Sequence, residues 1–168
     1  MRRFQIGLLI FLGIILSSSC EKDDICVEGD TPLLVIEFYD ISDTTTLKQV
    51  PTLRVVGVGQ TVTVNTVTDR SNLSTISIPL KTDENTTSFI LINSSTAAED
   101  GTETGNVDTI TFTYSRIEDF LSRGCGFVVN YDELVAEVTA DTNNWIQDIE
   151  ITQSLVTNSD STHVKIFH

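Results

Sequence analysis

From residue 31 onward, hydrophobic and polar side chains alternate along much of the chain. In the segment DTITFTYSRI at 108–117, Ile, Phe and Tyr alternate with Thr and Ser. A period of two places successive side chains on opposite faces of a β-strand, so that one face is buried and the other meets solvent. The run TSFILIN at 87–93 is almost continuously apolar, as expected of a central strand covered on both faces.

Other segments rich in Val, Ile and Thr share this β-type composition. They lie at 31–40, 52–59, 61–67, 74–80, 126–138, 145–156 and 163–167. The segment 126–138 is long enough for two strands, and Pro79 favours an edge position for the end of 74–80. This succession of short strands predicts an all-β fold, an immunoglobulin-like or related antiparallel β-sandwich of about eight or nine strands.

Three segments between these strands are read from their local composition. SRIEDFLSRG at 115–124 fits one or two helical turns ending at Gly124, and it fits a strand equally well. GVGQ at 57–60 is typical of a hairpin turn, and the polar stretch at 93–106 is typical of an exposed loop joining two core strands.

The N-terminus has the pattern of an export signal. Met1-Arg2-Arg3 is followed by the apolar run IGLLIFLGIIL at 6–16 and then by serines. A basic segment, a short apolar segment and small residues predict a secretory signal peptide over residues 1–19. The run is too short for a transmembrane helix, which needs about 18 or more apolar residues.

Ser17, Ser18 and Ser19 directly precede Cys20. This resembles the lipobox of bacterial lipoproteins, in which small residues precede a cysteine that is acylated and becomes the mature N-terminus. The usual pattern has Leu three residues before the cysteine, whereas Leu16 stands four before it. The resemblance implies lipidation at Cys20, and two or three acyl chains hold a protein far more firmly than one. The alternative is ordinary cleavage among the serines, which leaves Cys20 as a free or disulfide-bonded thiol.

Lys22, Asp23 and Asp24 follow the predicted lipidation site. A lysine followed by two acids resembles the surface-export signal of lipoproteins in the flavobacterial group, and the alternative is a solvated acidic tether. We expect residues 20–30 to form a lipidated acidic tether and residues 31–168 to form a single β-sandwich domain. Its location would be the outer membrane, lipid-anchored, on the cell surface or the periplasmic face.

Charge narrows the range of partners. Removal of residues 1–19 leaves eight basic and 24 acidic side chains, a net charge of −16. Such a balance disfavours nucleic acid and anionic membrane surfaces, because both repel it. The acids are spread along the chain, which is typical of a solvated surface.

Cys26 and Cys125 remain as an even pair in an oxidising compartment, which predicts a disulfide between them. It would close a loop of about 100 residues, worth about 4.7 kcal/mol in the chain-entropy model. The alternative is a buried Cys125 thiol and an exposed Cys26. A redox role is not expected, because the chain has no C-x-x-C motif.

The sequence lacks several common catalytic motifs. The sequence has no G-x-S-x-G, phosphate loop or dinucleotide fingerprint, and its two histidines, His163 and His168, lie at the C-terminus. We therefore expect no enzyme activity, no cofactor and no metal site. Four acids in or beside the polar stretch could together hold calcium, although their spacing is not that of an EF-hand and surface acids are usually solvated. They are Glu99, Asp100, Glu103 and Asp108.

Trp145 is the only tryptophan. It follows the turn-like ADTNN, and an exposed ring there would be a ligand contact of the kind that sugar-binding β-sandwiches use. The alternative is a core or rim anchor, the commoner place for a single Trp.

The segments CEKDDIC, PLLVIEFYD and RGCGFVVNYD resemble an uncharacterised family, a domain of unknown function, of flavobacterial-type bacterial lipoproteins. That family has no assigned activity, so no functional residues carry over. Two classes of function stay open. One is a non-catalytic binding or adhesion module on the outer membrane that recognises a glycan or a protein. The other is a structural or accessory subunit of an outer-membrane or periplasmic complex.

Overall fold

The computed structural model describes residues 30–97 and 102–168, and this part of the chain contains ten β-strands and no helix. The strands are β1 (Leu34–Asp40), β2 (Asp43–Leu47), β3 (Val50–Gly57), β4 (Ser71–Leu73), β5 (Thr75–Ile78), β6 (Thr86–Ala97), β7 (Glu103–Ser122), β8 (Gly126–Val138), β9 (Asp148–Ile151) and β10 (Val164–Phe167). Accordingly, the described residues include no helix that could cross a membrane.

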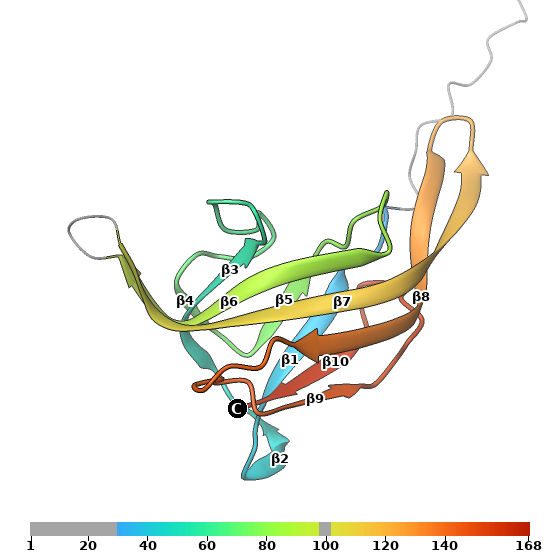
Figure 1. Ribbon diagram of the computed structural model, residues 1–168. Helices are drawn as coiled ribbons and strands as arrows, with labels where there is room; N and C mark the ends of the chain where they lie inside the picture. Colours follow the sequence, from blue (N-terminus) through green and yellow to red (C-terminus); the bar gives the residue numbers. More distant parts are fainter. Residues whose placement is uncertain (1–29, 98–101) are drawn as a thin grey trace, which may run out of the picture.

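The strands form two five-stranded sheets (Figure 1). One sheet has the order β2-β1-β10-β9, with β5 also pairing with β1, and the other has the order β4-β3-β6-β7-β8. The predicted all-β, two-sheet arrangement is confirmed, with ten strands instead of eight or nine. One pair differs from a purely antiparallel sandwich, because β1 and β10 run parallel, with Ile36 opposite Val164.

The core lies between the two sheets and follows the alternation of the sequence. Leu34, Ile36 and Phe38 of β1 are fully buried, as are Ile110 and Phe112 of β7, and all belong to one hydrophobic cluster. Full burial of such a side chain stabilises the fold by about 1.5–3 kcal/mol. The period-two pattern therefore identified the inward faces of these strands correctly.

The predicted strand at 61–67 is wrong. The turn at 57–60 is present, with Gln60 N donating to Gly57 O at 2.9 Å, but only an isolated bridge between Val56 and Thr63 follows it. Val62 is 68% exposed, whereas Val64 packs against the core and Val67 is buried in it, so the alternating valines do not form one continuous covered face. An alternating pattern stabilises a strand only when one face is covered.

The structure also differs from the prediction in two other segments, 93–106 and 126–138. The stretch at 93–106 is mostly hairpin rather than loop, because β6 continues to Ala97 and β7 begins at Glu103. The segment 126–138 is the single strand β8, which bends at a bulge where Glu133 has a φ of 54°.

The open choice at 115–124 is decided in favour of a strand. Residues up to Ser122 extend β7 and pair with β8, with Phe120 opposite Phe127. Pairing with β8 supplies hydrogen bonds along the whole segment, which an isolated helix of two turns does not match. At the end of the chain, the strands predicted at 145–156 and 163–167 shrink to β9 and β10.

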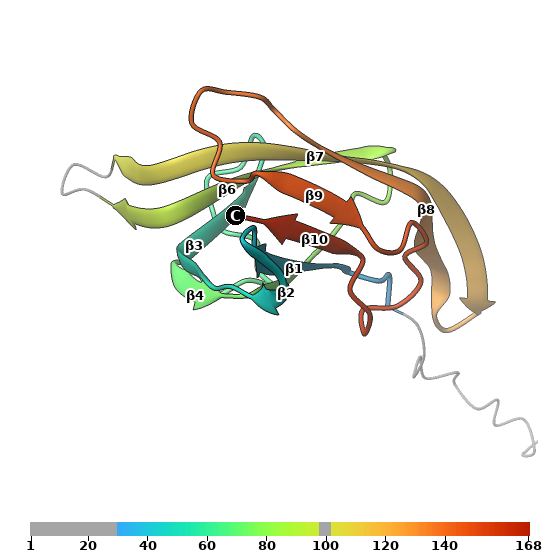
Figure 2. The ribbon, with the colours of Figure 1, turned by 90° about the horizontal axis from the view of Figure 1, so that it is seen from below.

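Strand β7 is 20 residues long and extends beyond the sandwich at both ends (Figures 1 and 2). At one end it forms a hairpin with β6, and we call residues 94–97 and 102–106 the polar hairpin. At the other end it forms a hairpin with β8, and we call residues 117–130 the aromatic arm. The two hairpins lie at opposite ends of the molecule.

His163 is buried where β10 joins β1. Its Nδ1 accepts a hydrogen bond from Val35 N at 3.1 Å, and its own main-chain N donates to Val35 O at 3.0 Å. Because Nδ1 is an acceptor, the neutral ring carries its proton on Nε2, which is buried and has no hydrogen-bond partner among the described residues. Burial lowers the pKa of His163, because a charged ring would lose its hydration.

This environment predicts a loss of stability in mild acid. Since the pKa of His163 is lower in the folded chain, the unfolded chain binds the proton first once the pH falls below about 6.5, and the free energy of unfolding decreases. His163→Asn keeps an acceptor near the Nδ1 position but does not titrate. Urea unfolding between about pH 7 and pH 5 should therefore show a steeper fall for the parent chain than for the variant. Parallel curves would refute the assignment, whatever the offset between them.

Candidate functional site

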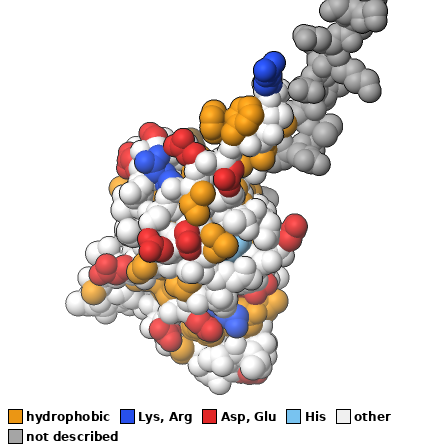
Figure 3. Space-filling model, turned by 90° about the vertical axis from the view of Figure 1, so that its right-hand side faces the viewer, with side chains coloured by type: hydrophobic (Ala, Val, Ile, Leu, Met, Phe, Trp, Pro, Cys, Tyr) orange, Lys and Arg blue, Asp and Glu red, His pale blue; other side chains and the backbone are white. Residues whose placement is uncertain are grey.

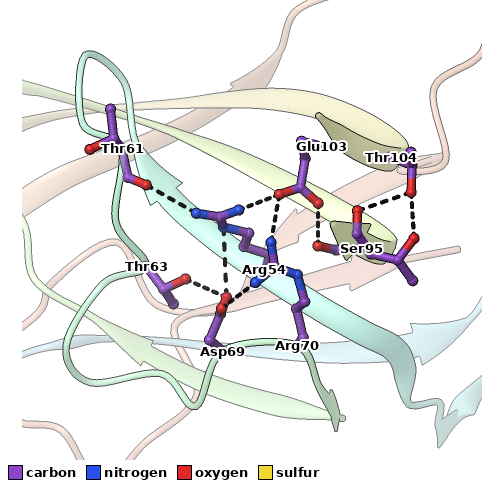
Figure 4. Close-up of polar contacts among 9 residues, drawn as sticks. Arg54, Thr61, Thr63, Asp69, Arg70, Ser95, Glu103 and Thr104 are labelled. Carbon is purple, nitrogen blue, oxygen red and sulfur yellow. Dashed lines mark hydrogen bonds and ion pairs between the residues drawn. The ribbon is translucent and has the colours of Figure 1, made fainter. Parts of the chain in front are cut away.

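A cluster of ion pairs joins the polar hairpin to the body of the domain (Figure 4). Arg54 comes from β3, Asp69 and Arg70 from the loop before β4, Ser95 from β6 and Glu103 from the start of β7. We call these five residues the arginine–carboxylate cluster. It joins the hairpin to two segments that lie more than 30 positions earlier in the chain.

Glu103 is the centre of this cluster. Its Oε2 accepts hydrogen bonds from Arg54 Nη1 and from Arg70 Nη2, the latter at 2.8 Å. Its Oε1 accepts a hydrogen bond from the buried hydroxyl of Ser95 at 2.5 Å. Burial alone raises the pKa of Glu103, but these hydrogen bonds and the charges of the two arginines outweigh burial and lower it. Glu103 is therefore held ionised.

Asp69 supplies a second negative charge, so that the charges of both Arg54 and Arg70 are balanced. It accepts a hydrogen bond from Arg70 Nη1 at 2.6 Å and lies 3.7 Å from Arg54 Nε. Arg54 Nη2 also donates to Thr61 O at 3.0 Å, which ties the irregular loop to the cluster. Two guanidinium groups thus face two carboxylates. A bound anion would have to displace Glu103 or Asp69, so the arrangement suits a brace better than an anion site.

The backbone of the polar hairpin is shaped for this contact. Ser94 has a φ of 56° at a bulge in β6, and Gly105 on β7 has a φ of 125°. A Cβ atom on Gly105 would lie 2.7 Å from Asn93 O and 3.0 Å from Ser94 O. Only glycine lets the two strands approach this closely, and the approach accompanies the bulge that includes the buried Ser95.

The aromatic arm has a different character. Phe120 and Phe127 are 58% and 66% exposed, and their rings form an edge-to-face pair with centroids 5.2 Å apart. Ile117 and Leu121 are exposed beside them. Figure 3 shows hydrophobic side chains gathered on the part of the molecule that projects beyond the body.

The root of the aromatic arm is held by two buried tyrosines. Tyr131 OH donates to Leu80 O at 3.1 Å, and Tyr114 OH donates to Lys81 O at 3.0 Å, while the two rings pack edge to face. Burial raises the pKa of Tyr131 to about 12, so its hydroxyl stays protonated as a donor. These bonds fasten the arm to the loop before β6.

The chain enters the body beside this arm. Val129 N donates a hydrogen bond to Thr31 Oγ1 at 3.3 Å, so the start of the domain runs along β8. Cys125 lies in the turn at the tip, where its N donates to Ser122 Oγ at 3.0 Å. Cys20, Cys26 and the predicted export signal, Lys22, Asp23 and Asp24, lie outside the described residues. The pairing of Cys26 with Cys125 stays a prediction.

Trp145 is not an exposed ligand contact. Its side chain is buried, and its indole Nε1 donates to Leu91 O at 3.3 Å. The ring packs against Phe38 and His168, with centroids 6.2 and 5.6 Å away. The residue therefore has the alternative role considered above, that of a core anchor.

The two described acids among those considered for calcium, Glu103 and Asp108, do not come together. Glu103 is taken by two arginines, and Asp108 is buried and accepts a hydrogen bond from Ile146 N at 2.8 Å. The two lie five positions apart on β7 and therefore face opposite sides of the sheet. Burial raises the pKa of Asp108. Glu99 and Asp100 lie outside the described residues, and within residues 30–97 and 102–168 no three His, Cys, Asp or Glu side chains are grouped to hold a metal ion.

Sequence reasoning missed the arginine–carboxylate cluster. Glu103 was considered only as a loop acid, and its partner Arg54 lies 49 positions away. The one available signal was Arg54 itself, a charged residue between Leu53 and Val55 in an apolar strand.

A family model matches residues 52–168, and the chain belongs to this family, a family of unknown function (DUF6452). No curated protein and no solved structure matches the chain.

The first prediction for the site concerns Glu103. Glu103→Gln removes one charge and leaves two partly buried guanidinium groups beside a single carboxylate, so the free energy of unfolding should fall by about 1–3 kcal/mol. Glu84→Gln is the matched control, because among the described residues Glu84 forms an ion pair with the exposed Lys81 alone, and its loss should change stability by at most about 1 kcal/mol. Equal effects in urea unfolding would contradict the bracing role.

The second prediction concerns Gly105. Gly59 also has a positive φ, of 85°, but a Cβ atom there would meet nothing within 4 Å. Gly59→Ala should therefore cost only the backbone strain of about 1–2 kcal/mol. Gly105→Ala adds a clash with two carbonyl oxygens and should lower the thermal midpoint further. A smaller loss at Gly105 than at Gly59 would show that the hairpin does not need this close approach.

Proposed function

We propose that this member of the DUF6452 family is a lipid-anchored, non-catalytic binding module of the bacterial envelope, held at the outer membrane by an acylated Cys20. The signal-peptide pattern of residues 1–19 and the lipobox-like serines support the anchor. The spread of acidic charge supports a solvated domain that does not bind nucleic acid.

The observation that carries the proposal is the position of the chain entry relative to the polar hairpin. Thr31 contacts Val129 at the root of the aromatic arm, whereas the polar hairpin lies at the other end of β7 (Figures 1 and 2). A strand of 20 residues spans about 65 Å at 3.3 Å per residue. An anchor at the entry end would leave the polar hairpin projecting from the membrane.

The polar hairpin has the surface expected of a binding edge. Thr96 and Thr104 share a hydroxyl hydrogen bond across its strands and are solvent-exposed, and both strands are rich in Thr, Ser and Asn. Such side chains donate and accept hydrogen bonds with a glycan or a protein backbone. The arginine–carboxylate cluster ties the hairpin to the body of the domain, which lowers the entropy lost on binding.

A disulfide between Cys26 and Cys125 is part of this proposal. Thr31 lies beside Val129, and the five residues back to Cys26 span at most about 17 Å. Cys125 is four residues along the hairpin from Val129, about 13 Å in strand geometry. The two cysteines are therefore within reach of each other, and the bond would join the tether to the tip of the aromatic arm.

The second candidate function is a structural or accessory subunit of an envelope complex. The observation that favours it is the exposure of Phe120 and Phe127, since exposed apolar patches on soluble domains often mark interaction sites. In that case a protein partner would cover the arm.

The decisive experiment follows the protein in cells. Cys20→Ala should abolish incorporation of radiolabelled palmitate and release the domain from the membrane fraction, whereas Cys26→Ala should leave both unchanged. Protease treatment of intact cells then tests which way the anchored domain faces.

Loss of the domain on protease treatment supports an outward-facing binding module and directs a glycan-array screen to the polar hairpin. Protection that disappears on lysis favours the accessory subunit. Retention of label and membrane association in Cys20→Ala would refute the anchor.

A further inference from the structure

We propose that the aromatic arm inserts its tip into the lipid interface next to the anchor, so that the domain touches the membrane at a second point. The inference rests on the proposed lipid anchor, and it assigns a ligand, the headgroup and upper acyl region of a bilayer, to Phe120, Leu121 and Phe127.

The side chains at the tip suit this environment. Phe120 and Phe127 expose more than half of their surface while their rings pack edge to face, so a compact apolar wedge projects into solvent. Aromatic and aliphatic side chains gain free energy by entering the boundary between headgroups and acyl chains. The arm is a paired ribbon, with Ser122 opposite Gly126 at its end, so the inward-facing half of its backbone groups bond across the ribbon. The outward-facing half keeps hydrogen-bond partners in the hydrated headgroup region, which limits the tip to a shallow insertion.

The distribution of charged residues along the aromatic arm limits how deeply its tip can enter the bilayer. Residues 120–131 contain no acid in a chain with 24, and the tip carries one base, Arg123. Glu118 and Asp119 begin the acidic part of the arm and are both exposed. Ionised carboxylates do not enter the acyl region, so insertion stops above them. The negative charge of the domain favours a zwitterionic surface over an anionic one.

The position at which the chain enters the domain favours lipid as the ligand that covers the tip of the aromatic arm. Thr31 lies against Val129, only two residues from Phe127, so the tether leaves the body next to the wedge. An acylated Cys20 is eleven residues from Thr31, a reach of at most about 40 Å, and acyl chains there keep the arm close to the bilayer. Membrane binding of the arm is then an intramolecular step at high effective concentration.

A protein partner fits the arm less well. A stable protein interface buries about 800 Å² on each side. The exposed apolar side chains of the arm, four in all, form the end of a two-stranded ribbon with acids directly behind them. A lipid interface needs no matching shape, so a narrow wedge is sufficient.

The test uses the full-length chain, processed and acylated in a bacterial host and reconstituted into phosphatidylcholine vesicles with brominated acyl chains. The unmodified chain has only the buried Trp145 and gives the baseline emission. Phe127→Trp places a reporter at the tip, and Val135→Trp places one at a site of β8 with similar exposure, 58%, beyond the bend at Glu133.

The expected result is a blue shift and strong quenching by brominated lipid for Phe127→Trp and neither effect for Val135→Trp. Equal quenching in the two variants, or quenching in neither, overturns the inference. Emission of Phe127→Trp that is shielded from both brominated lipid and aqueous iodide in native outer-membrane vesicles, but not in pure lipid vesicles, also overturns it, because a protein then covers the arm.

Failure of the anchor and failure of the wedge are separable. Palmitate incorporation reports the anchor alone, so an acylated chain whose tip is not quenched refutes only the wedge. Phe127→Ser with Phe120→Ser supplies a second measurement in the acylated chain. The double variant should remain membrane-bound but lose protection of the Arg123 peptide bond from trypsin, and unchanged protection would contradict membrane contact at the tip.

Discussion

The parallel pairing of β1 with β10 is the constraint on which the rest of the architecture depends. β10 lies between β1 and β9, and β9 has no other strand partner in the described part of the chain. β2 and β5 join the same sheet only through β1. The pairing is fixed on both sides of the backbone, since His163 exchanges hydrogen bonds with Val35 through its ring and its main chain. Without it β10 and β9 would leave the sheet, and the core residues that they cover would meet water.

The long strand β7 gives the molecule two ends of opposite chemistry. At one end, ionic contacts hold a hydroxyl-rich hairpin against the body, and its two strands approach closely at Gly105, where no larger residue fits. At the other end, two tyrosines hold the root of a hairpin whose tip is apolar. A bulge near each root changes the direction of the ribbon, at Ser94 on one side and Glu133 on the other. The sandwich separates a hydroxyl-rich surface at one end from an exposed apolar surface at the other.

How much could be predicted from sequence varied with the range of the interactions. The strands around Ile110 and Phe112 were predictable, because the faces of a strand follow directly from a local period. The segment 61–67 has the same period but makes only an isolated bridge to β3, and 115–124 needed the distant β8 to choose between helix and strand. The arginine–carboxylate cluster depends on contacts across 33 and 49 positions, which no local pattern encodes. The aromatic side chains of the arm were visible in the sequence, but their exposure was not.

The join between β1 and β10 also has a consequence for the order of events during folding. Val35 and His163 lie 128 positions apart, so the first sheet cannot close until almost the entire chain has been made. Contacts at such separation form slowly, because a long loop must be ordered before any hydrogen bond rewards it. The first sheet of a chain with this topology therefore closes late in folding, after β10 has been synthesised. Late closure would suit the proposed export, because such a chain would still lack its completed sheet when translocation begins.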